Sequence, residues 1–196
     1  MNAVDTFKAN FITTFPTLLD ARPFMCEGSP LDCTIFIVGF NPATTMHSDF
    51  WNYWSDGYGY RKSEWFEQYK SDRKKQKEAT GRPHMAVSAT RRNIDWVIEG
   101  GTGTSFLETN IYASPTATEA GLSDDKRVTE IFEFLLATIR PKLILTHGRT
   151  ATDAVRSLNP NAALQDISHL SRGWSRLRAI EIGRSLHAKT QPAYQP

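Results

Sequence analysis

The sequence predicts an α/β fold with three layers, in which helices cover both faces of a central, mainly parallel, four-stranded sheet. Short apolar runs rich in β-branched residues are typical of strands that are buried on both faces. Amphipathic helical patterns separate these runs, and such an alternation favours parallel pairing of the strands. The chain has 196 residues. With no internal repeat and no low-complexity linker, it is expected to form one domain over residues 1–196.

Three runs carry the strand signal most clearly, namely residues 34–38, 105–112 and 142–146. Glycine or proline punctuates each run, as expected where a strand meets a loop. Residues 177–189 are predicted to hold the fourth strand region, as a hairpin-like pair around Gly183. Ligands of parallel α/β sheets bind beyond the carboxyl ends of the strands. The segments that directly follow the strands are therefore the first candidates for a functional site.

Helical spacing of apolar residues predicts the intervening elements. The segments with this spacing are residues 4–19, 63–79, 89–99, 124–140 and 149–158. Apolar side chains recur in them at steps of three and four residues, which places those side chains on one face. The segment 124–140 has the most regular pattern.

The distribution of charge and the number of cysteines indicate which partners and metal sites the protein can have. The net charge is only +2, but residues 61–92 carry a surplus of six positive charges, which leaves the rest at about −4. Such a local basic zone suits a polyanion such as DNA, and it equally fits a solvated helix face. Cys26 and Cys33 do not have the spacing of a zinc or iron–sulfur site, so we expect free thiols and no metal or other cofactor. With no signal-like N-terminus and no apolar span, a cytoplasmic monomer that does not contact membranes is expected.

Four motifs in order resemble the uracil-DNA glycosylase superfamily, and are most similar to its mismatch-specific uracil/thymine branch. They are residues 38–44 (VGFNPAT), 108–112 (ETNIY), 141–151 (PKLILTHGRTA) and 183–194 (GRSLHAKTQPAY). The resemblance spans residues 34–196 and implies a DNA glycosylase, a hydrolase that cleaves the N-glycosidic bond of a damaged or mismatched base. It implies that Gly39, Phe40 and Pro42 let the backbone approach the base. The iron–sulfur branches need four cysteines and are excluded.

Asn41 marks a departure from the most active members, which have a carboxylate in the first motif. Bond cleavage builds positive charge on the sugar, and an amide can hold the attacking water but supplies no opposing charge. The resemblance assigns Asn41 to the positioning of water and Asn110 to reading of the base edge. Asn41 before Pro42 could equally be a turn residue, and Asn110 could satisfy a neighbouring backbone group. His147 is interpreted mainly as a strand-end residue.

Gln191 stands where the closing motif of the family has a histidine. That histidine donates a hydrogen bond to the departing base, and glutamine can donate one as well. His187 and the segment His169-Leu170-Ser171 offer other placements of this motif. We assign the second catalytic position to Gln191 and leave these alternatives open.

An aromatic ring must also stack on an extruded base. Aromatic residues crowd the segment 50–60, and Phe50 or Trp54 is our candidate, although this cluster could simply pack the next helix. Arg91 and Arg92 are candidate phosphate contacts, and the tail residues Pro192, Ala193 and Tyr194 are expected to lie against the duplex.

Two other functions remain open from the sequence. A nucleic-acid-binding module with the same pocket but no useful chemistry is favoured by Asn41 together with Gln191. A flavodoxin-like domain that binds a free nucleotide is disfavoured, because no glycine-rich phosphate loop of recognised spacing is present.

Overall fold

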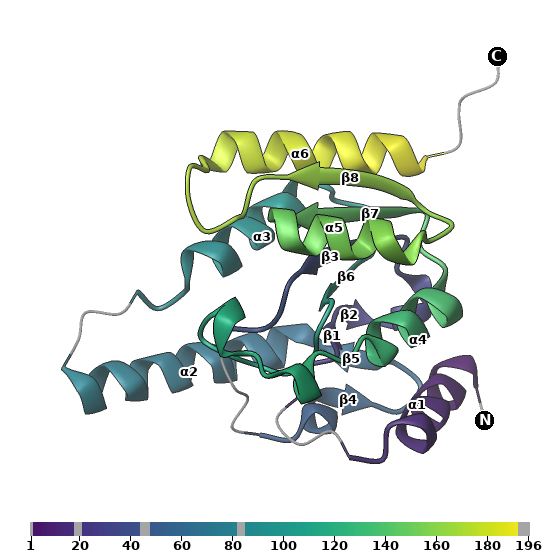
Figure 1. The fold of residues 1–196 in the computed structure, drawn as a ribbon, viewed down its shortest axis with the longest axis horizontal. Coiled ribbons are helices and arrows are strands. Elements are labelled where there is room, and N and C mark those ends of the chain that lie inside the picture. The colour runs from purple at the N-terminus through teal and green to yellow at the C-terminus, as the bar shows by residue number, and fades with distance from the viewer. Residues whose placement is uncertain (1, 18–20, 44–47, 82–84, 192–196) are drawn as a thin grey trace.

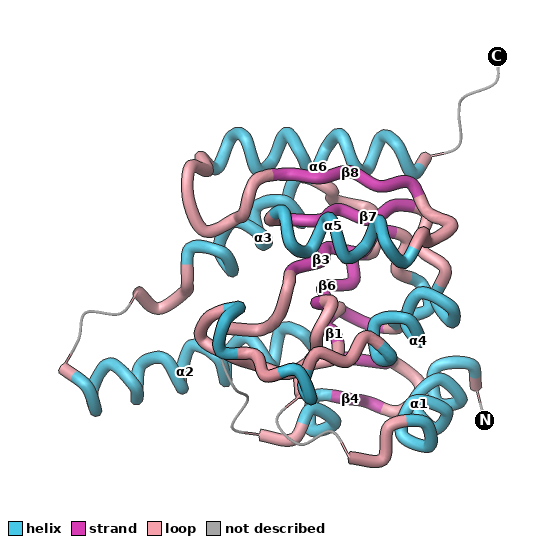
Figure 2. The backbone as a smooth tube through the Cα atoms, viewed as in Figure 1, coloured by secondary structure: helices cyan, strands magenta, loops and turns pink. Residues whose placement is uncertain are grey.

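A computed structural model describes residues 2–17, 21–43, 48–81 and 85–191. Within these ranges the chain forms a five-stranded sheet flanked by helices on both faces (Figure 1), so the α/β class is confirmed. Figure 2 shows the strands of this sheet stacked between the helices. The strand order is β1-β6-β3-β7-β8.

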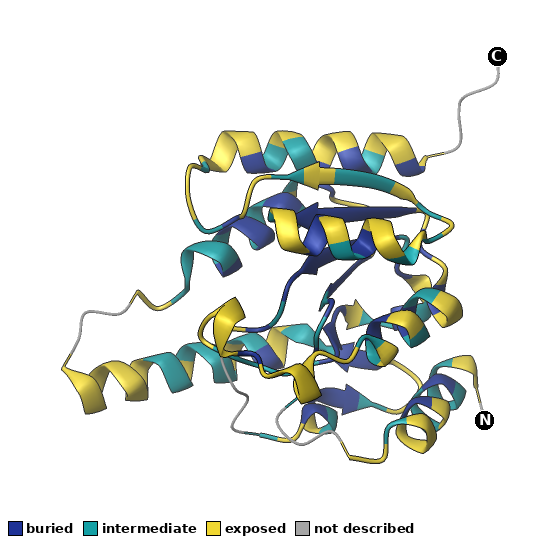
Figure 3. Ribbon diagram, in the orientation of Figure 1, coloured by how far each residue is buried: buried dark blue, intermediate teal, exposed yellow. Residues whose placement is uncertain are grey.

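The three strands predicted from apolar runs are present as β3 (Ile35–Gly39), β6 (Phe106–Asn110) and β7 (Leu143–His147). β3 pairs in parallel with both β6 and β7. All five residues of β3 and of β7 are buried, which explains why these strands have no polar–apolar alternation (Figure 3).

The outer strands differ from the expectation. β8 (Ala163–Ile167) pairs in parallel with β7, and β1 (Phe24–Met25) pairs antiparallel with β6. The sheet is therefore mixed and has five strands, and the prediction of four mainly parallel strands was incomplete. A small antiparallel sheet, in the order β2-β5-β4, joins Glu27–Gly28, Gly59–Arg61 and Trp54–Ser55.

The strand pair predicted in residues 177–189 was wrong, because this segment is the helix α6 (Arg176–Thr190). Its buried residues are Ala179, Gly183, Leu186 and Thr190, which recur at steps of three and four. Gly183 makes no turn. A Cβ there would lie 2.0 Å from the carbonyl oxygen of Val97, so glycine allows α6 to cross closely over α3 (Ala89–Gly100).

The other helices follow the predicted segments with small shifts at their ends. They are α1 (Ala3–Thr14), α2 (Lys62–Thr80), α4 (Glu130–Ile139) and α5 (Arg149–Leu158). Short 3-10 turns lie at Pro30–Asp32, Phe50–Tyr53, Glu119–Gly121 and Asp124–Lys126. In the described ranges, no helix has the length and apolar character needed to cross a bilayer.

Two apolar cores hold the layers together. On one face of the sheet, Ile35 and Ile37 pack with Val97 of α3 and Leu186 of α6. On the other face, strand residues pack with α1, α4 and α5 in a larger core that includes many aromatic rings. Because side chains alternate along a strand, Gly39, Asn110 and His147 face the same side as the α3–α6 core. A site at these strand ends is therefore covered by α3.

Candidate functional site

A cavity of about 390 Å³ lies at the carboxyl ends of β3, β6 and β7, under the first turn of α3. The residues that define its chemistry are Arg22, Phe40, Asn41, Arg91, Glu108, Asn110, His147 and His169. Gly39 lies between the side chains of Asn110 and His147. A Cβ on Gly39 would lie 2.8 Å from Oδ1 of Asn110 and 3.0 Å from Nε2 of His147. Glycine here lets two polar side chains from neighbouring strands meet over the backbone.

This close approach predicts the effect of a single added methyl group. We expect Gly39→Ala to lower the free energy of unfolding by roughly 1–3 kcal/mol, because the neighbours must shift to accept the Cβ. Urea unfolding of the variant and the parent protein measures the difference. Gly121→Ala is the matched control, since its Cβ would meet nothing closer than 3.4 Å. An equal loss in both variants would contradict the crowded geometry over Gly39.

Asn41 is held in a defined orientation by the loop that follows β6. Its Nδ2 donates to Oγ1 of Thr116 at 2.7 Å, and the Thr116 hydroxyl in turn donates to the carbonyl oxygen of Thr118 at 2.7 Å. The backbone N–H of Thr116 also donates to the carbonyl oxygen of Pro42. Because the threonine hydrogen is used elsewhere, its oxygen must accept from Asn41. The amide oxygen of Asn41 is therefore left to accept a hydrogen bond from a ligand or a water molecule.

His147 is a buried, neutral imidazole. Burial and the neighbouring His169 lower the pKa of His147 to about 3, so the ring carries no charge at neutral pH. Its Nδ1 is buried and has no hydrogen-bond partner among the described residues. Asn110 likewise makes no side-chain hydrogen bond within those ranges, and both residues line the cavity.

His169 follows β8 and packs edge-on against His147, with ring centroids 5.0 Å apart. The backbone N–H of Ser171 donates to Nδ1 of His169 at 3.2 Å, and the Ser171 hydroxyl lies 2.8 Å from the same atom. An Nδ1 that accepts a hydrogen bond places the proton of the neutral ring on Nε2. Asn93 of α3 fixes the next residue by donating to the carbonyl oxygen of Leu170 at 2.6 Å. His169 thus offers an oriented N–H donor at the cavity.

Gln191 does not share this cavity. It caps the C-terminus of α6, where its Nε2 lies 3.5 Å from Nδ1 of His187. His187 contacts Thr104, before β6 begins, and Lys142, just before β7, donates to the carbonyl oxygen of Thr190. Gln191 therefore lies at the amino ends of the strands, opposite Asn41. The structure therefore does not bring Gln191 into the cavity that Asn41 lines, whereas His169 does line it.

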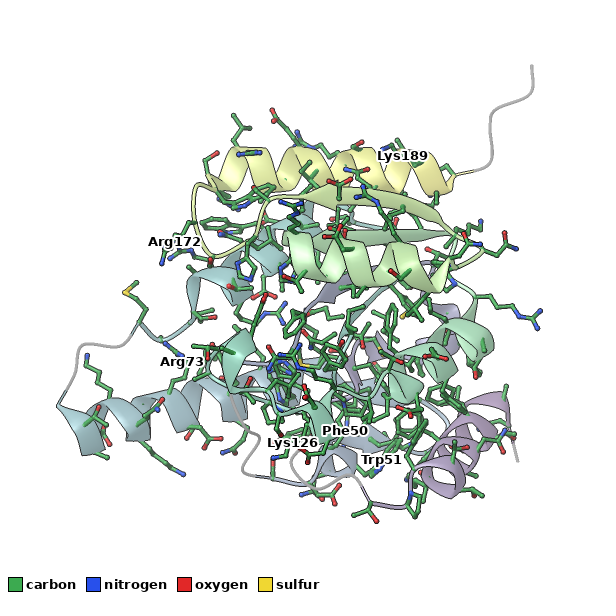
Figure 4. The ribbon with its side chains drawn as sticks, in the orientation of Figure 1. Phe50, Trp51, Arg73, Lys126, Arg172 and Lys189 are labelled. Carbon is green, nitrogen blue, oxygen red and sulfur yellow. The ribbon has the colours of Figure 1, made fainter. Side chains whose placement is uncertain are left out.

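The two stacking candidates from the sequence are core residues. Phe50 stacks on Tyr60 with centroids 4.8 Å apart, and Trp54 stacks on Phe7 at 6.3 Å. Both are buried in the aromatic core beside α1 (Figure 4 labels Phe50), and neither lines the cavity. Phe40 does line it, with its ring edge-on to Tyr112 and the Arg127 guanidinium 5.7 Å from its centroid.

The residues proposed to contact phosphates differ in their exposure. Arg91 is buried and pairs with Glu108 and with Asp95, the latter at 2.8 Å, so it is not a free surface cation. Arg92 is partly buried, with its guanidinium 5.1 Å from the Trp96 ring centroid. Pro192, Ala193 and Tyr194 lie outside the described residues.

Exposed arginines that the sequence analysis did not single out follow His169. Arg172, Arg176 and Arg178 are exposed, and the Arg178 guanidinium lies 4.3 Å from the Trp174 ring centroid. Figure 4 shows Arg172 before α6 and Arg73 on α2 on the same side of the molecule. Three arginines within the seven residues 172–178 are a cluster of positive charge that could have been identified from the sequence.

Neither cysteine is among the described residues that line the cavity. Cys26 and Cys33 are both buried with free thiols. Among the residues that the structure describes, no three His, Cys, Asp or Glu side chains form a group suited to a metal ion.

No model of a known protein family matches the chain, and no curated protein matches its sequence.

Proposed function

We propose that the protein is a DNA glycosylase-like hydrolase that binds an extruded base in this cavity and cleaves its N-glycosidic bond. The observation that carries the proposal is the oriented amide of Asn41, which lines a ligand-sized cavity beside Asn110 and two neutral histidines. Those groups have complementary roles in glycosidic cleavage. Asn41 holds water against the sugar carbon, and Asn110 reads the edge of the base. Nε2 of His169 donates to the departing base as negative charge develops on it.

The strand ends support this assignment together with the resemblance of the first three motifs. Gly39 ends β3 and Asn41 follows it, Asn110 ends β6, and His147 ends β7. The fourth motif is then residues 169–171 after β8, in place of the tail near Gln191. Phe40 stacks on the base in this proposal, in place of Phe50 or Trp54. Arg172 and Arg178, which are exposed and form no ion pair among the described residues, contact phosphates, a role for which exposed guanidinium groups are well suited.

Release of free base from oligonucleotides tests the proposal. Duplexes and single strands that contain uracil, hypoxanthine or a mismatched thymine are incubated with protein, and abasic sites are cleaved and resolved on a gel. We expect release from at least one substrate and none with Asn41→Ala, whose affinity for DNA should stay within a few-fold, since the amide acts mainly in the transition state. Asn41→Asp should raise the rate on uracil, because a carboxylate opposes the positive charge that develops on the sugar.

A nucleic-acid-binding module is the second candidate, and the charge inventory of the cavity favours it. The carboxylates that line the cavity are Glu108, paired with Arg91 and Lys62, and Glu119, which accepts from Thr150. Glu108 is therefore not free to stabilise a sugar cation, and Glu119 is exposed, where water weakens the effect of its charge. If the wild type and Asn41→Asp are both inert while DNA affinity falls steeply with added salt, this second function replaces the first.

A further inference from the structure

Arg22 carries a positive charge in the cavity, and no acidic side chain of the described residues forms an ion pair with it. Its guanidinium lines the cavity and lies 5.8 Å from the ring centroid of Trp65, a buried residue of α2. The backbone N–H of Arg22 donates to the carbonyl oxygen of Ala113 at 3.0 Å, which anchors the residue beside the end of β6. In the described ranges, the Arg22 side chain makes no hydrogen bond and no ion pair.

Among the described residues, the acids near Arg22 form ion pairs with other cations. Glu108 pairs with Arg91 and, at 2.6 Å, with Lys62. Asp95 pairs with Arg91 at 2.8 Å and with Lys62 at 3.4 Å. Two carboxylates therefore balance two cations, and Arg22 adds a third positive charge to this buried group. A partly buried guanidinium without a counter-ion is costly, since it has lost part of its hydration.

The surroundings of Arg22 are positive as well. The first turn of α3 contributes Ser88 and Thr90 to the cavity, and a helix N-terminus carries partial positive charge. Arg73 also lines the cavity, with its guanidinium 5.6 Å from the ring centroid of Tyr69. Burial and Arg91 lower the pKa of Arg22 to about 10, so the guanidinium stays charged at neutral pH. Among the described residues that line the cavity, Glu119 is the acid without an ion pair, and its carboxylate accepts a hydrogen bond from Thr150.

We propose that Arg22 is a specificity residue that binds an anionic oxygen group of the ligand, either a nucleotide phosphate or a carboxylate on the base. The planar guanidinium, held against Trp65, matches the paired oxygens of both groups. The inference rests on the proposed function, because it assumes that the ligand is a nucleotide or a base. A neutral base in the cavity would leave Arg22 unpaired, and an anionic ligand would supply its missing counter-charge.

Calorimetric titration with two pairs of small ligands tests the inference and separates the two sources of the anion. The first pair is deoxyuridine and its 5′-monophosphate, and the second is uracil and 5-carboxyuracil. We expect the charged member of one pair to bind about ten- to a hundredfold more tightly than the neutral member, as a charge-assisted hydrogen bond would give. The pair that shows this difference identifies the source.

Substitution assigns the difference to Arg22. In Arg22→Gln the preference for the charged ligand should disappear, whereas Arg22→Lys should keep part of it, because the charge remains but the paired donors are lost. Arg184→Gln, on an exposed arginine of α6, is the matched control and should keep the full preference. Circular dichroism melts establish that each variant is folded.

The outcomes distinguish this inference from the proposed function. Equal binding of charged and neutral ligands by the wild type, or an unchanged preference in Arg22→Gln, would overturn the role of Arg22 and leave the base site intact. Tight binding of the monophosphate that needs Arg22, without any binding of uracil or deoxyuridine, would keep Arg22 as the anion-binding residue. That last result would instead contradict recognition of a base.

Discussion

Glu108→Gln should lower the free energy of unfolding by about 3–5 kcal/mol at neutral pH, the loss typical of a buried ion pair from which one partner is removed. Glu108 is 5% exposed and faces Arg91 and Lys62, with Arg22 nearby. Removal of its charge leaves three cations against Asp95 alone. Urea unfolding of the variant and the parent measures the loss.

The same network predicts a dependence on pH. Burial alone would raise the pKa of Glu108, but Arg91 and Lys62 outweigh burial and lower it to about 2, from an ordinary value of 4.5. A carboxylate with a lowered folded-state pKa stabilises the protein fully above the unfolded-state value and loses this contribution as the pH falls toward 2. The stability gap between wild type and Glu108→Gln should therefore be constant above pH 5 and narrow between about pH 4.5 and pH 2.

Two carboxylates serve as controls for this prediction. Asp95→Asn should cost less than Glu108→Gln, because the Asp95 side chain is 33% exposed and water replaces part of its interaction. Asp124→Asn should leave stability unchanged, since that carboxylate is fully exposed. A gap that stays constant down to pH 2 would contradict the lowered pKa of Glu108, because stability changes with pH only where the folded and unfolded states bind different numbers of protons.

The central strands could be predicted from sequence because burial on both faces leaves a continuous apolar run, as in residues 35–38. β8 gave no such signal, because it is an edge strand in which Gln165 and Asp166 stand among apolar residues. In α6, the alternation of Ile180 and Ile182 before Gly183 imitated a strand and a turn. Tertiary packing against α3 explains that glycine, and no local pattern reveals such a contact.

Some residues of the candidate site could likewise be predicted from the sequence, and others could not. Asn41 and Asn110 could be predicted because strand order alone brings the carboxyl ends of β3 and β6 together. Arg22 and Thr116 could not, because they reach the cavity from loops whose paths depend on the whole fold. Phe50 and Trp54 are aromatic, as a ring that stacks on a base must be, but both rings are buried in the aromatic core beside α1.

A large functional effect is also expected from His169, the residue proposed as the closing histidine. If His169 donates to the departing base, His169→Ala should slow base release by about a hundredfold or more, the typical loss of one oxyanion donor. His169→Gln should retain more activity than His169→Ala, because glutamine still offers an N–H donor. Single-turnover release from the substrate identified in the gel assay measures both rates, and DNA affinity should stay within a few-fold.

Gln191→Ala distinguishes the two placements of the closing motif. Gln191 lies at the amino ends of the strands, against His187, so its loss should leave the rate of base release unchanged. Ser171→Ala should give an intermediate loss: it removes the hydroxyl beside Nδ1 of His169 but keeps the backbone N–H that fixes the tautomer. A rate that falls with Gln191→Ala but not with His169→Ala would return the catalytic role to the tail, and with it the motif placement that the strand order disfavours.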